Sequence, residues 1–241
     1  MTKSLHFTFR PILAGLCFLM AGFLCSLGVW QLHRLEWKNE LIAQVNARMS
    51  APAISFDEAV RRAEEGEWME YSPVLLAGHA DEKDAAVVFG SYEAAAGGYY
   101  FVPVLRSVGE SAYVNEGFVP QKVLKEKFPS KRLNGATEET VSGLFRYRET
   151  PTPPASWFQT KGKSADGLWF IRDPLAFAGE VGVNASPYYV DQFVVEGRDW
   201  PLGGTTRVEF SNRHLEYALT WFGLALSLVG VWIAFSLQKR G

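Results

Sequence analysis

Two long uncharged segments dominate the pattern of hydrophobic and polar positions along this chain. Residues 11–30 contain no Asp, Glu, Lys, Arg or His and are rich in Leu, Phe, Ala and Gly, and residues 217–238 form a second uncharged run. A helix of about 20 residues is roughly 30 Å long, which is the thickness of the hydrocarbon core of a membrane. The pattern therefore predicts two transmembrane helices, over residues 11–31 and 217–238.

The first apolar run also has features of a signal peptide, because Lys3 and Arg10 precede it. Signal peptides have shorter apolar regions, of about 7 to 15 residues, that end in a small-residue cleavage site. No such site follows Trp30, and Cys17 stands one residue too late for a lipoprotein signal. An uncleaved membrane anchor is the favoured interpretation.

Charge predicts how the two helices are oriented. The tails, residues 1–10 and 239–241, have a net charge of +4, whereas the 20 basic and 26 acidic residues between the spans give −6. Positively charged tails stay in the cytoplasm. We therefore predict cytoplasmic termini and an outer domain, residues 32–216, on the periplasmic side of a bacterial inner membrane. Cys17 and Cys25 both lie in the first span, so this outer domain has no thiol, which suits an oxidising compartment.

The start of the outer domain has a helical pattern. Apolar and aromatic positions from Trp30 to Val45 recur at helical spacing, which predicts that the first helix continues to Met49 and ends before Pro52. Ser55 is followed three residues later by Glu58, which is the form of a capping box, and the helix after it is expected to end near Gly66.

Short strands follow in the rest of the outer domain. They are rich in Val, Tyr and Phe and are predicted over residues 71–77, 86–89, 99–106, 112–118, 140–147, 168–172 and 188–196. A hairpin is expected around Gly109, short helices after Pro120 (to Phe128) and after Asp173, and turns at residues 97–98 and 203–204. The predicted fold class is a membrane protein with two transmembrane helices flanking one α+β domain, whose mostly antiparallel sheet can curl into a partial barrel.

Composition excludes several classes of function. The chain is 48% hydrophobic with a net charge of −2 and a mean hydropathy of −0.03, which argues against a disordered chain and against a basic nucleic-acid binder. With four His and two Cys, of which only His79 lies well inside the outer domain, a zinc hydrolase or a cysteine nucleophile is disfavoured. The tails are too short for a sensor's output domain. An exported enzyme with a carboxylate pair ranks last, since no Asp or Glu has an informative spacing.

Two histidines lie where the spans meet the outer domain. His33 follows the first span, and His214 precedes the second, with Tyr217 and Trp221 on the same helix face. An interfacial histidine beside aromatic residues suits an axial haem ligand, and cations such as Arg34, Lys38 and Arg213 suit the propionates. The simpler alternative, favoured by the residues alone, is an aromatic belt of Trp30, Trp37, Tyr217 and Trp221 with two polar histidines at the headgroup level.

Three ordered motifs change that balance. Residues 28–38 resemble the G-x-W-Q-x-x-R-x-x-W-K motif that ends the first span of the Surfeit locus 1 family, and residues 212–221 resemble its N-x-H-x-x-Y-x-x-T-W. Residues 114–120 are similar to its V-N-R-G-W-V-P segment, with Glu116 in place of Arg and Phe118 in place of Trp, and residues 141–149 are similar to its following G-L-x-R strand.

The resemblance implies a respiratory-chain assembly factor for a haem-copper terminal oxidase (cytochrome c oxidase), which acts as a chaperone rather than an enzyme and binds haem a. It implies that His214 is the haem ligand, whereas His33 falls on a variable motif position, so its role rests on the placement argued above. The expected cofactor-binding residues are His214, Arg34, Arg213, Tyr217, Trp221, Trp30 and His33. The expected partners are the oxidase catalytic subunit, a haem a synthesis enzyme and the lipid bilayer, with no nucleic acid. The alternative is a scaffold that stabilises an oxidase intermediate without haem.

Overall fold

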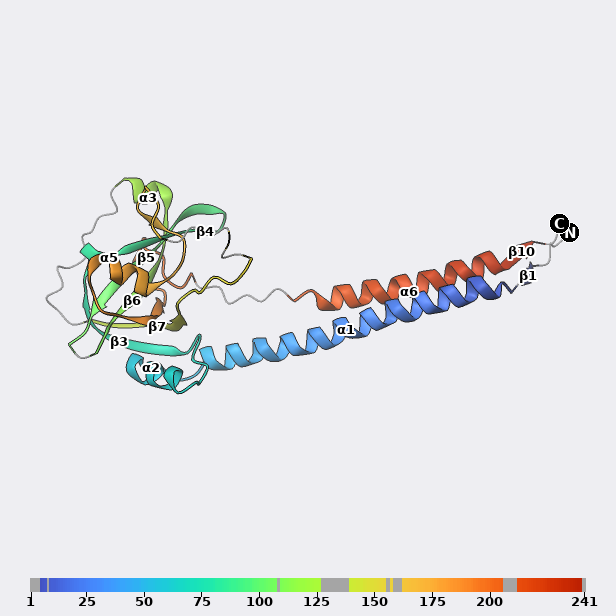
Figure 1. Cartoon of the computed structure of the whole chain (residues 1–241), viewed down its shortest axis with the longest axis horizontal. Helices are drawn as coiled ribbons and strands as arrows, with labels where there is room; N and C mark the ends of the chain where they lie inside the picture. The colour runs from blue at the N-terminus through green and yellow to red at the C-terminus, as the bar shows by residue number, and fades with distance from the viewer. Residues whose placement is uncertain are drawn as a thin grey trace. The chain divides into compact units, whose positions relative to one another are not determined.

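The computed structural model describes residues 5–7, 9–107, 109–126, 139–154, 157, 162–205 and 212–239. These residues belong to two units. The helix pair comprises the described parts of residues 1–45 and 209–241, and the barrel domain comprises those of residues 46–208. Figure 1 labels most of the helices and strands of both units.

The helix pair is formed by α1 (Pro11–Met49) and α6 (His214–Ser236). Strands β1 (Leu5–Phe7) and β10 (Leu237–Lys239) are paired antiparallel, so these two strands lie together at one end of the pair (Figure 1). The continuation of α1 to Met49 is confirmed. Helix α6 begins three residues before the predicted span, and it ends at Ser236 because the next residues pair with β1. Lys3 and Arg240, which entered the prediction of orientation, lie outside the described residues.

The two helices pack along a narrow seam. The least exposed residues recur at alternating steps of three and four, which is the spacing of coiled-coil seams; on α1 they include Ala14, Ala21, Gly28, Gln31 and Leu35, and on α6 His214, Ala218, Trp221 and Ala225. Gly28 is needed for this approach, since a Cβ there would lie 2.6 Å from the Phe222 ring.

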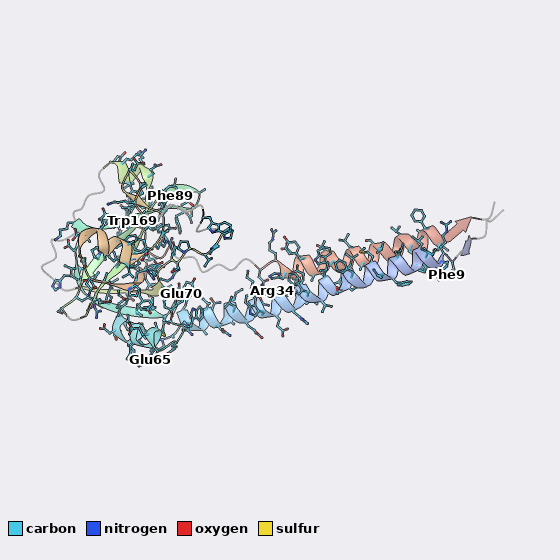
Figure 2. All side chains as sticks on the ribbon, in the orientation of Figure 1. Phe9, Arg34, Glu65, Glu70, Phe89 and Trp169 are labelled. Carbon is cyan, nitrogen blue, oxygen red and sulfur yellow. The ribbon has the colours of Figure 1, made fainter. Side chains whose placement is uncertain are left out.

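The outward faces of the pair are apolar. Leu19 is 71% and Leu226 is 75% exposed, and side chains project outward along both helices in Figure 2. Helices that are hydrophobic on every side are stable in a protein interior or in lipid. Both helices are therefore candidate membrane spans in length and composition.

The barrel domain is built on a closed sheet. Its ring strands are β3 (Pro73–Ala80), β5 (Ala95–Leu105), β6 (Ser111–Pro120), β7 (Glu139–Tyr147) and β9 (Ala185–Gln192). The sheet order runs β3-β7-β9-β6-β5, and a further pairing of β5 with β3 closes the ring. Only β6 and β9 are parallel within the ring, so the mostly antiparallel sheet is confirmed. Because β7 returns beside β3 after the consecutive strands β3, β5 and β6, the ring is a five-stranded Greek-key barrel, the architecture of OB-type folds.

Shorter elements flank the barrel. They are β2 (Ile54–Ser55), α2 (Phe56–Glu64), η1 (Glu82–Asp84), β4 (Ala86–Tyr92), α3 (Gln121–Lys125), β8 (Leu168–Trp169) and α5 (Pro174–Val181). The predicted caps are confirmed: Ser55 Oγ accepts a hydrogen bond from the backbone N–H of Glu58, and Asp173 Oδ1 accepts one from that of Leu175. The buried side chains form separate clusters: Phe145 packs with residues of all five ring strands and of α2, whereas Phe101, Tyr113 and Tyr189 pack against Phe177 of α5. Helix α3 ends at Lys125, with Glu126 as its C-cap, so it is shorter than the predicted helix to Phe128; residues 127 and 128 lie outside the described residues.

Three local predictions were wrong in detail. Gly97 and Gly98 lie inside β5 rather than in a turn, because the chain turns earlier, at Glu93 and Ala94. A Cβ at Gly97 would lie 2.2 Å from the carbonyl oxygen of Val119, so this glycine permits close strand packing. Strand β8 stops at Trp169, since only two of its residues pair with β4, and β9 covers residues 185–192 rather than 188–196.

Candidate functional site

His214 lies in the seam of the helix pair, where it contacts a residue of the other helix. It is the first residue of α6 and is half-buried, and its Nδ1 lies 2.7 Å from Oε1 of Gln31 on α1. An amide oxygen only accepts hydrogen bonds, so the contact with Gln31 Oε1 favours the tautomer that is protonated on Nδ1, in which Nε2 has the lone pair. Histidines that bind metals are commonly held in this way, with the other ring nitrogen donating to an oxygen.

A second hydrogen bond joins the helices at the same end. Asn212 Nδ2 donates to Asn39 Oδ1 at 2.8 Å, and Asn212 Oδ1 is buried without a partner among the described residues. Two polar contacts in an otherwise apolar seam favour one register of the hairpin, because any shift would leave these groups unpaired. The position of His214 along α1 is thus fixed by its own contact with Gln31 and by the hydrogen bond between Asn212 and Asn39.

The aromatic residues predicted for the site lie on both helices, with Tyr217 and Trp221 on α6 after His214 and Trp30 beside Gln31 on α1. Trp30 is 54% and Tyr217 52% exposed, and Trp221 is half-buried in the seam. These values suit residues at the rim of a surface site. They equally suit the aromatic belt of a membrane interface.

The two predicted arginines have different surroundings. The Arg34 guanidinium lies 4.4 Å from the centre of the Trp37 ring, and among the described residues no Asp or Glu forms an ion pair with it. Arg213 Nε lies 3.3 Å from Glu216 Oε2, with both side chains exposed. Arg34 is therefore the arginine with more capacity for an added anion.

His33 is not brought to the same place. It is exposed and lies two residues from Gln31, which corresponds to about 200° around the helix. The structure thus groups His214 with Gln31, not with His33. The residues present fit a haem group: an imidazole that contacts Gln31 through Nδ1 and not Nε2, exposed aromatic side chains, and the Arg34 guanidinium, which forms no ion pair with a carboxylate among the described residues.

The barrel motif of residues 114–120 forms a buried hydrogen-bonded corner. Asn115 Nδ2 donates to Asp191 Oδ1 at 2.7 Å, and Asn115 Oδ1 accepts from the backbone N–H of Gly117. Gly117 has a φ of +128°, and a Cβ there would lie 1.9 Å from the carbonyl oxygen of Leu202. Glu116, which replaces Arg in the pattern of the resembled family, lies 3.5 Å from Arg198 Nη1.

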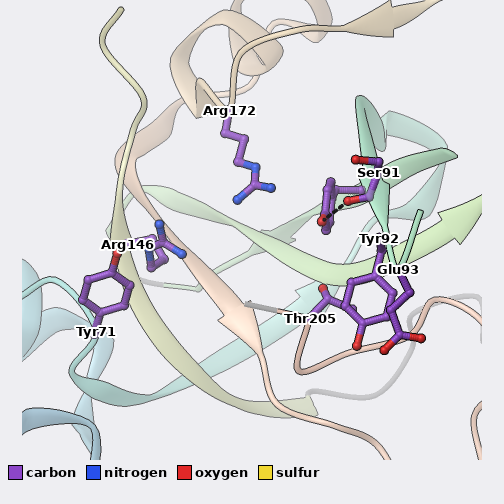
Figure 3. Close-up of a pocket in the computed structure, with 8 residues that line it drawn as sticks. Tyr71, Ser91, Tyr92, Glu93, Arg146, Arg172 and Thr205 are labelled. Atoms are coloured by element: carbon purple, nitrogen blue, oxygen red, sulfur yellow. Dashed lines mark hydrogen bonds between the residues drawn. The ribbon is translucent and has the colours of Figure 1, made fainter. Parts of the chain in front are cut away.

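A cavity of about 370 Å³ lies in the barrel domain beside this network (Figure 3). Two arginines line it, Arg146 on β7 and Arg172 between β8 and α5, with side chains only 14% and 22% exposed. Burial alone would lower the pKa of Arg172, but Tyr189, Asp191 and Glu149 outweigh it and raise that pKa. Both arginines are therefore charged at neutral pH.

Sequence reasoning missed Gln31 and this cavity. Gln31 carries a signal that is visible afterwards, since it is a polar residue in a quoted motif and at a seam position of α1. The cavity has no comparable signal. Its lining comes from six separate stretches of chain between Tyr71 and Thr205.

The fold and these sites define a class of protein. Its chain has an apolar helix, then a five-stranded barrel domain, then a second apolar helix, and a histidine and a glutamine are hydrogen-bonded where the two helices pack together. The model of the SURF1 family matches residues 18–226, and the chain belongs to this family.

Its relatives include Surfeit locus protein 1 from Gallus gallus, 31% identical over 88% of this chain and 72% of the relative. The Homo sapiens protein of the same name is 30% identical over 86% of this chain and 72% of its own length. The Takifugu rubripes protein is 30% identical over 89% and 92%.

Proposed function

We propose that the protein is a membrane-bound assembly factor for a haem-copper terminal oxidase, which holds haem a through His214 and assists its delivery to the oxidase catalytic subunit. Membership of the SURF1 family, known for cytochrome oxidase assembly, supports the assembly role. The observation that supports haem binding is the contact of His214 Nδ1 with Gln31, because it frees Nε2 as a ligand. The role is non-catalytic.

In this proposal α1 and α6 cross the membrane, with both termini in the cytoplasm and the barrel domain outside. The exposed apolar faces of the helices and the common end of β1 and β10 support the hairpin. The positive tails support the orientation. In this proposal the barrel domain lies in a bacterial periplasm and the helices lie in the inner membrane. The relatives named above come from animals.

Each residue of the helix pair has a defined role in holding the group. His214 Nε2 binds the iron, and Gln31 keeps the proton on Nδ1 and the ring in one orientation. Arg34 holds a propionate. Trp221, Tyr217 and Trp30 shield the ring, and Arg213 lies at the edge of the site, whereas His33 lies about 200° around α1 from Gln31 and is outside it. Haem, when bound, would supply a redox-active iron. The enzyme that makes haem a is a second partner, as the source of the group.

The test is the absorption spectrum of full-length protein purified from cells that make haem a. We expect a Soret band in the wild type and, in His214→Ala, an occupancy lower by about tenfold or more, as for loss of a metal-site residue. His33→Ala is the matched control, because it removes an exposed imidazole two residues from Gln31. Undiminished haem in His214→Ala would refute the ligand assignment.

A second function fits the exposed aromatic residues of the helix pair. In that case Trp30 and Tyr217 anchor the helices at the interface, and the protein is a scaffold for an oxidase intermediate. It would co-purify with oxidase subunits and remain colourless in cells with abundant haem a.

A further inference from the structure

The cavity of the barrel domain contains one arginine that is neutralised by its neighbours. Arg146 Nε donates to Glu70 Oε1 at 2.7 Å, and its Nη1 donates to Asp191 Oδ2 at 2.5 Å. Its guanidinium also lies 4.8 Å from the centre of the Tyr71 ring. Two carboxylates and an aromatic face therefore satisfy the Arg146 charge.

The second arginine is less well neutralised. Among the described residues, Glu149 is the only carboxylate within 4 Å of the Arg172 guanidinium, at 3.7 Å from Nε, and its side chain is 45% exposed. The Tyr99 ring lies beneath the guanidinium at 4.4 Å. Figure 3 shows Arg172 pointing into the cavity, opposite the hairpin that carries Ser91. A largely buried guanidinium that faces open space has donors left for a ligand.

The backbone of Arg172 is fixed, so its side chain is aimed rather than loose. Its N–H donates to Glu149 Oε2 at 3.0 Å, and its carbonyl accepts from the backbone N–H of Glu149 at 2.9 Å. Asp173, the next residue, caps helix α5. Three contacts at consecutive residues thus hold the point from which the guanidinium projects.

Strained backbone is concentrated at this cavity. Within the described part of the chain, three residues other than Gly have a positive φ: Tyr71, Glu93 and Ala94, at 67°, 48° and 65°. Tyr71 and Glu93 line the cavity, and Ala94 follows Glu93. Each such residue costs about 1–3 kcal/mol, and conformations of this kind cluster at ligand sites.

We propose that this cavity binds a small oxyanion, a carboxylate or phosphate group, on the Arg172 guanidinium, with hydroxyls of Ser91 and Thr205 as further donors. A volume of about 370 Å³ is at the lower end of the range for ligand pockets, so the ligand is small. The carboxylate of Glu93 on the lining disfavours polyanions and favours a single oxyanion. The site belongs to the barrel domain and does not depend on the proposed haem function.

The barrel motif contributes to this site through a chain of hydrogen bonds. Asn115 holds one oxygen of Asp191, and the other oxygen holds Arg146 in the cavity wall. Asn115 and Asp191 are both 3% exposed. The buried network therefore links the motif of residues 114–120 to the cavity.

The experiment measures thermal unfolding of full-length protein in detergent with sodium phosphate or sodium benzoate, against sodium chloride at equal ionic strength. A ligand at ten times its Kd stabilises the folded state by about 1.4 kcal/mol, which corresponds to a few degrees for a domain of this size. We expect one or both oxyanions to raise the Tm of the wild type, and which of them does so distinguishes phosphate from carboxylate.

Two variants and one control make the test specific. Arg172→Gln is expected to lose the shift, and Ser91→Phe, at an exposed position, is expected to block the cavity while leaving the ion pairs intact. Arg148→Gln is the matched control, because Arg148 is 45% exposed and outside the lining. The proposal is overturned if neither oxyanion shifts the wild type more than chloride does, or if Arg172→Gln or Ser91→Phe keeps the full shift.

Discussion

The contact between Gln31 and His214 gives the sharpest prediction for the helix pair. The change is Gln31→Leu, which removes the acceptor of the 2.7 Å hydrogen bond and keeps a side chain of similar size in the seam. A net hydrogen bond is worth about 1 kcal/mol, so its loss changes the ratio of the two imidazole tautomers about fivefold, in favour of the proton on Nε2. A proton on Nε2 blocks that nitrogen as a ligand.

Two further variants separate this effect from general damage. Gln31→Glu keeps an oxygen acceptor, so the proton is expected to stay on Nδ1. Asn39→Leu removes the other interhelical hydrogen bond, to Asn212, without touching His214. It controls for weakening of the hairpin as a whole.

The assay is the ¹⁵N spectrum of labelled histidines in the full-length protein in lipid nanodiscs at alkaline pH, where protonated and unprotonated ring nitrogens have well-separated shifts. The His214 signals are those absent from His214→Ala. Wild type, Gln31→Glu and Asn39→Leu should have the proton on Nδ1, and Gln31→Leu should shift it toward Nε2. In a haem titration of the same samples, Gln31→Leu should bind up to about fivefold more weakly, as expected from the change in the tautomer ratio. An unchanged tautomer in Gln31→Leu, or equal effects of Leu and Glu, would refute the reasoning.

Two predictions concern the barrel domain, and urea unfolding followed by tryptophan fluorescence measures both. Gly117→Ala should lower the free energy of unfolding by about 4 kcal/mol, because it strains a positive φ, clashes with the carbonyl oxygen of Leu202 and breaks the hydrogen bond which that oxygen accepts from Phe118. Gly66→Ala is the control, since Gly66 has a φ of +91° and no atom within 4 Å of an added Cβ, and it should cost about 1 kcal/mol. Equal losses in the two variants would exclude the clash. Tyr113→Phe should add about 1 kcal/mol, because the Tyr113 hydroxyl is buried without a partner among the described residues. Burial raises the pKa of Tyr113 from 10.0 to about 12, so this tyrosine ionises at a lower pH in the unfolded chain than in the folded protein. The wild type should therefore lose stability as the pH rises from 10 to 12, and Tyr113→Phe should lose less. A variant whose stability declines as steeply as that of the wild type would contradict this assignment.

Local signals in the sequence predicted much of the fold. The caps at Ser55 and Asp173 and the hairpin around Gly109 involve residues close together in the chain, where side-chain chemistry alone decides the conformation. The turn between β4 and β5 was missed because Glu93 and Ala94 adopt positive φ without the Asn or Gly that normally marks such a turn. The paired glycines nearby, Gly97 and Gly98, gave a stronger turn signal at the wrong place.

Closure of the barrel and the oxyanion cavity depend on distant residues. The β3–β5 pairing joins His79 to Leu105, and the cavity network joins Glu70 to Arg146 and Arg146 to Asp191. Alternating strand patterns specify which face of a strand is buried but not which strand pairs with it. In the helix pair, by contrast, the motif strings singled out His214, while its partner Gln31 became visible only through the packing of α1 on α6.

The motifs that carry the family resemblance divide between two places with different physical roles. The two helix motifs meet in one hydrogen bond, between Gln31 and His214, and their substitution is expected to change a ligand site while leaving the barrel domain folded. The barrel motif holds Asp191 through Asn115 and admits Leu202 beside Gly117, so its substitution acts on stability first. The two residues that differ from the family's pattern in this motif both fit their surroundings: Glu116 lies beside Arg198, and Phe118 is 1% exposed among aromatic rings. Under the proposed function, a variant that loses haem while its stability in urea is unchanged is therefore expected among substitutions in the helix motifs. A variant that loses both haem and stability is expected among substitutions in the barrel motif.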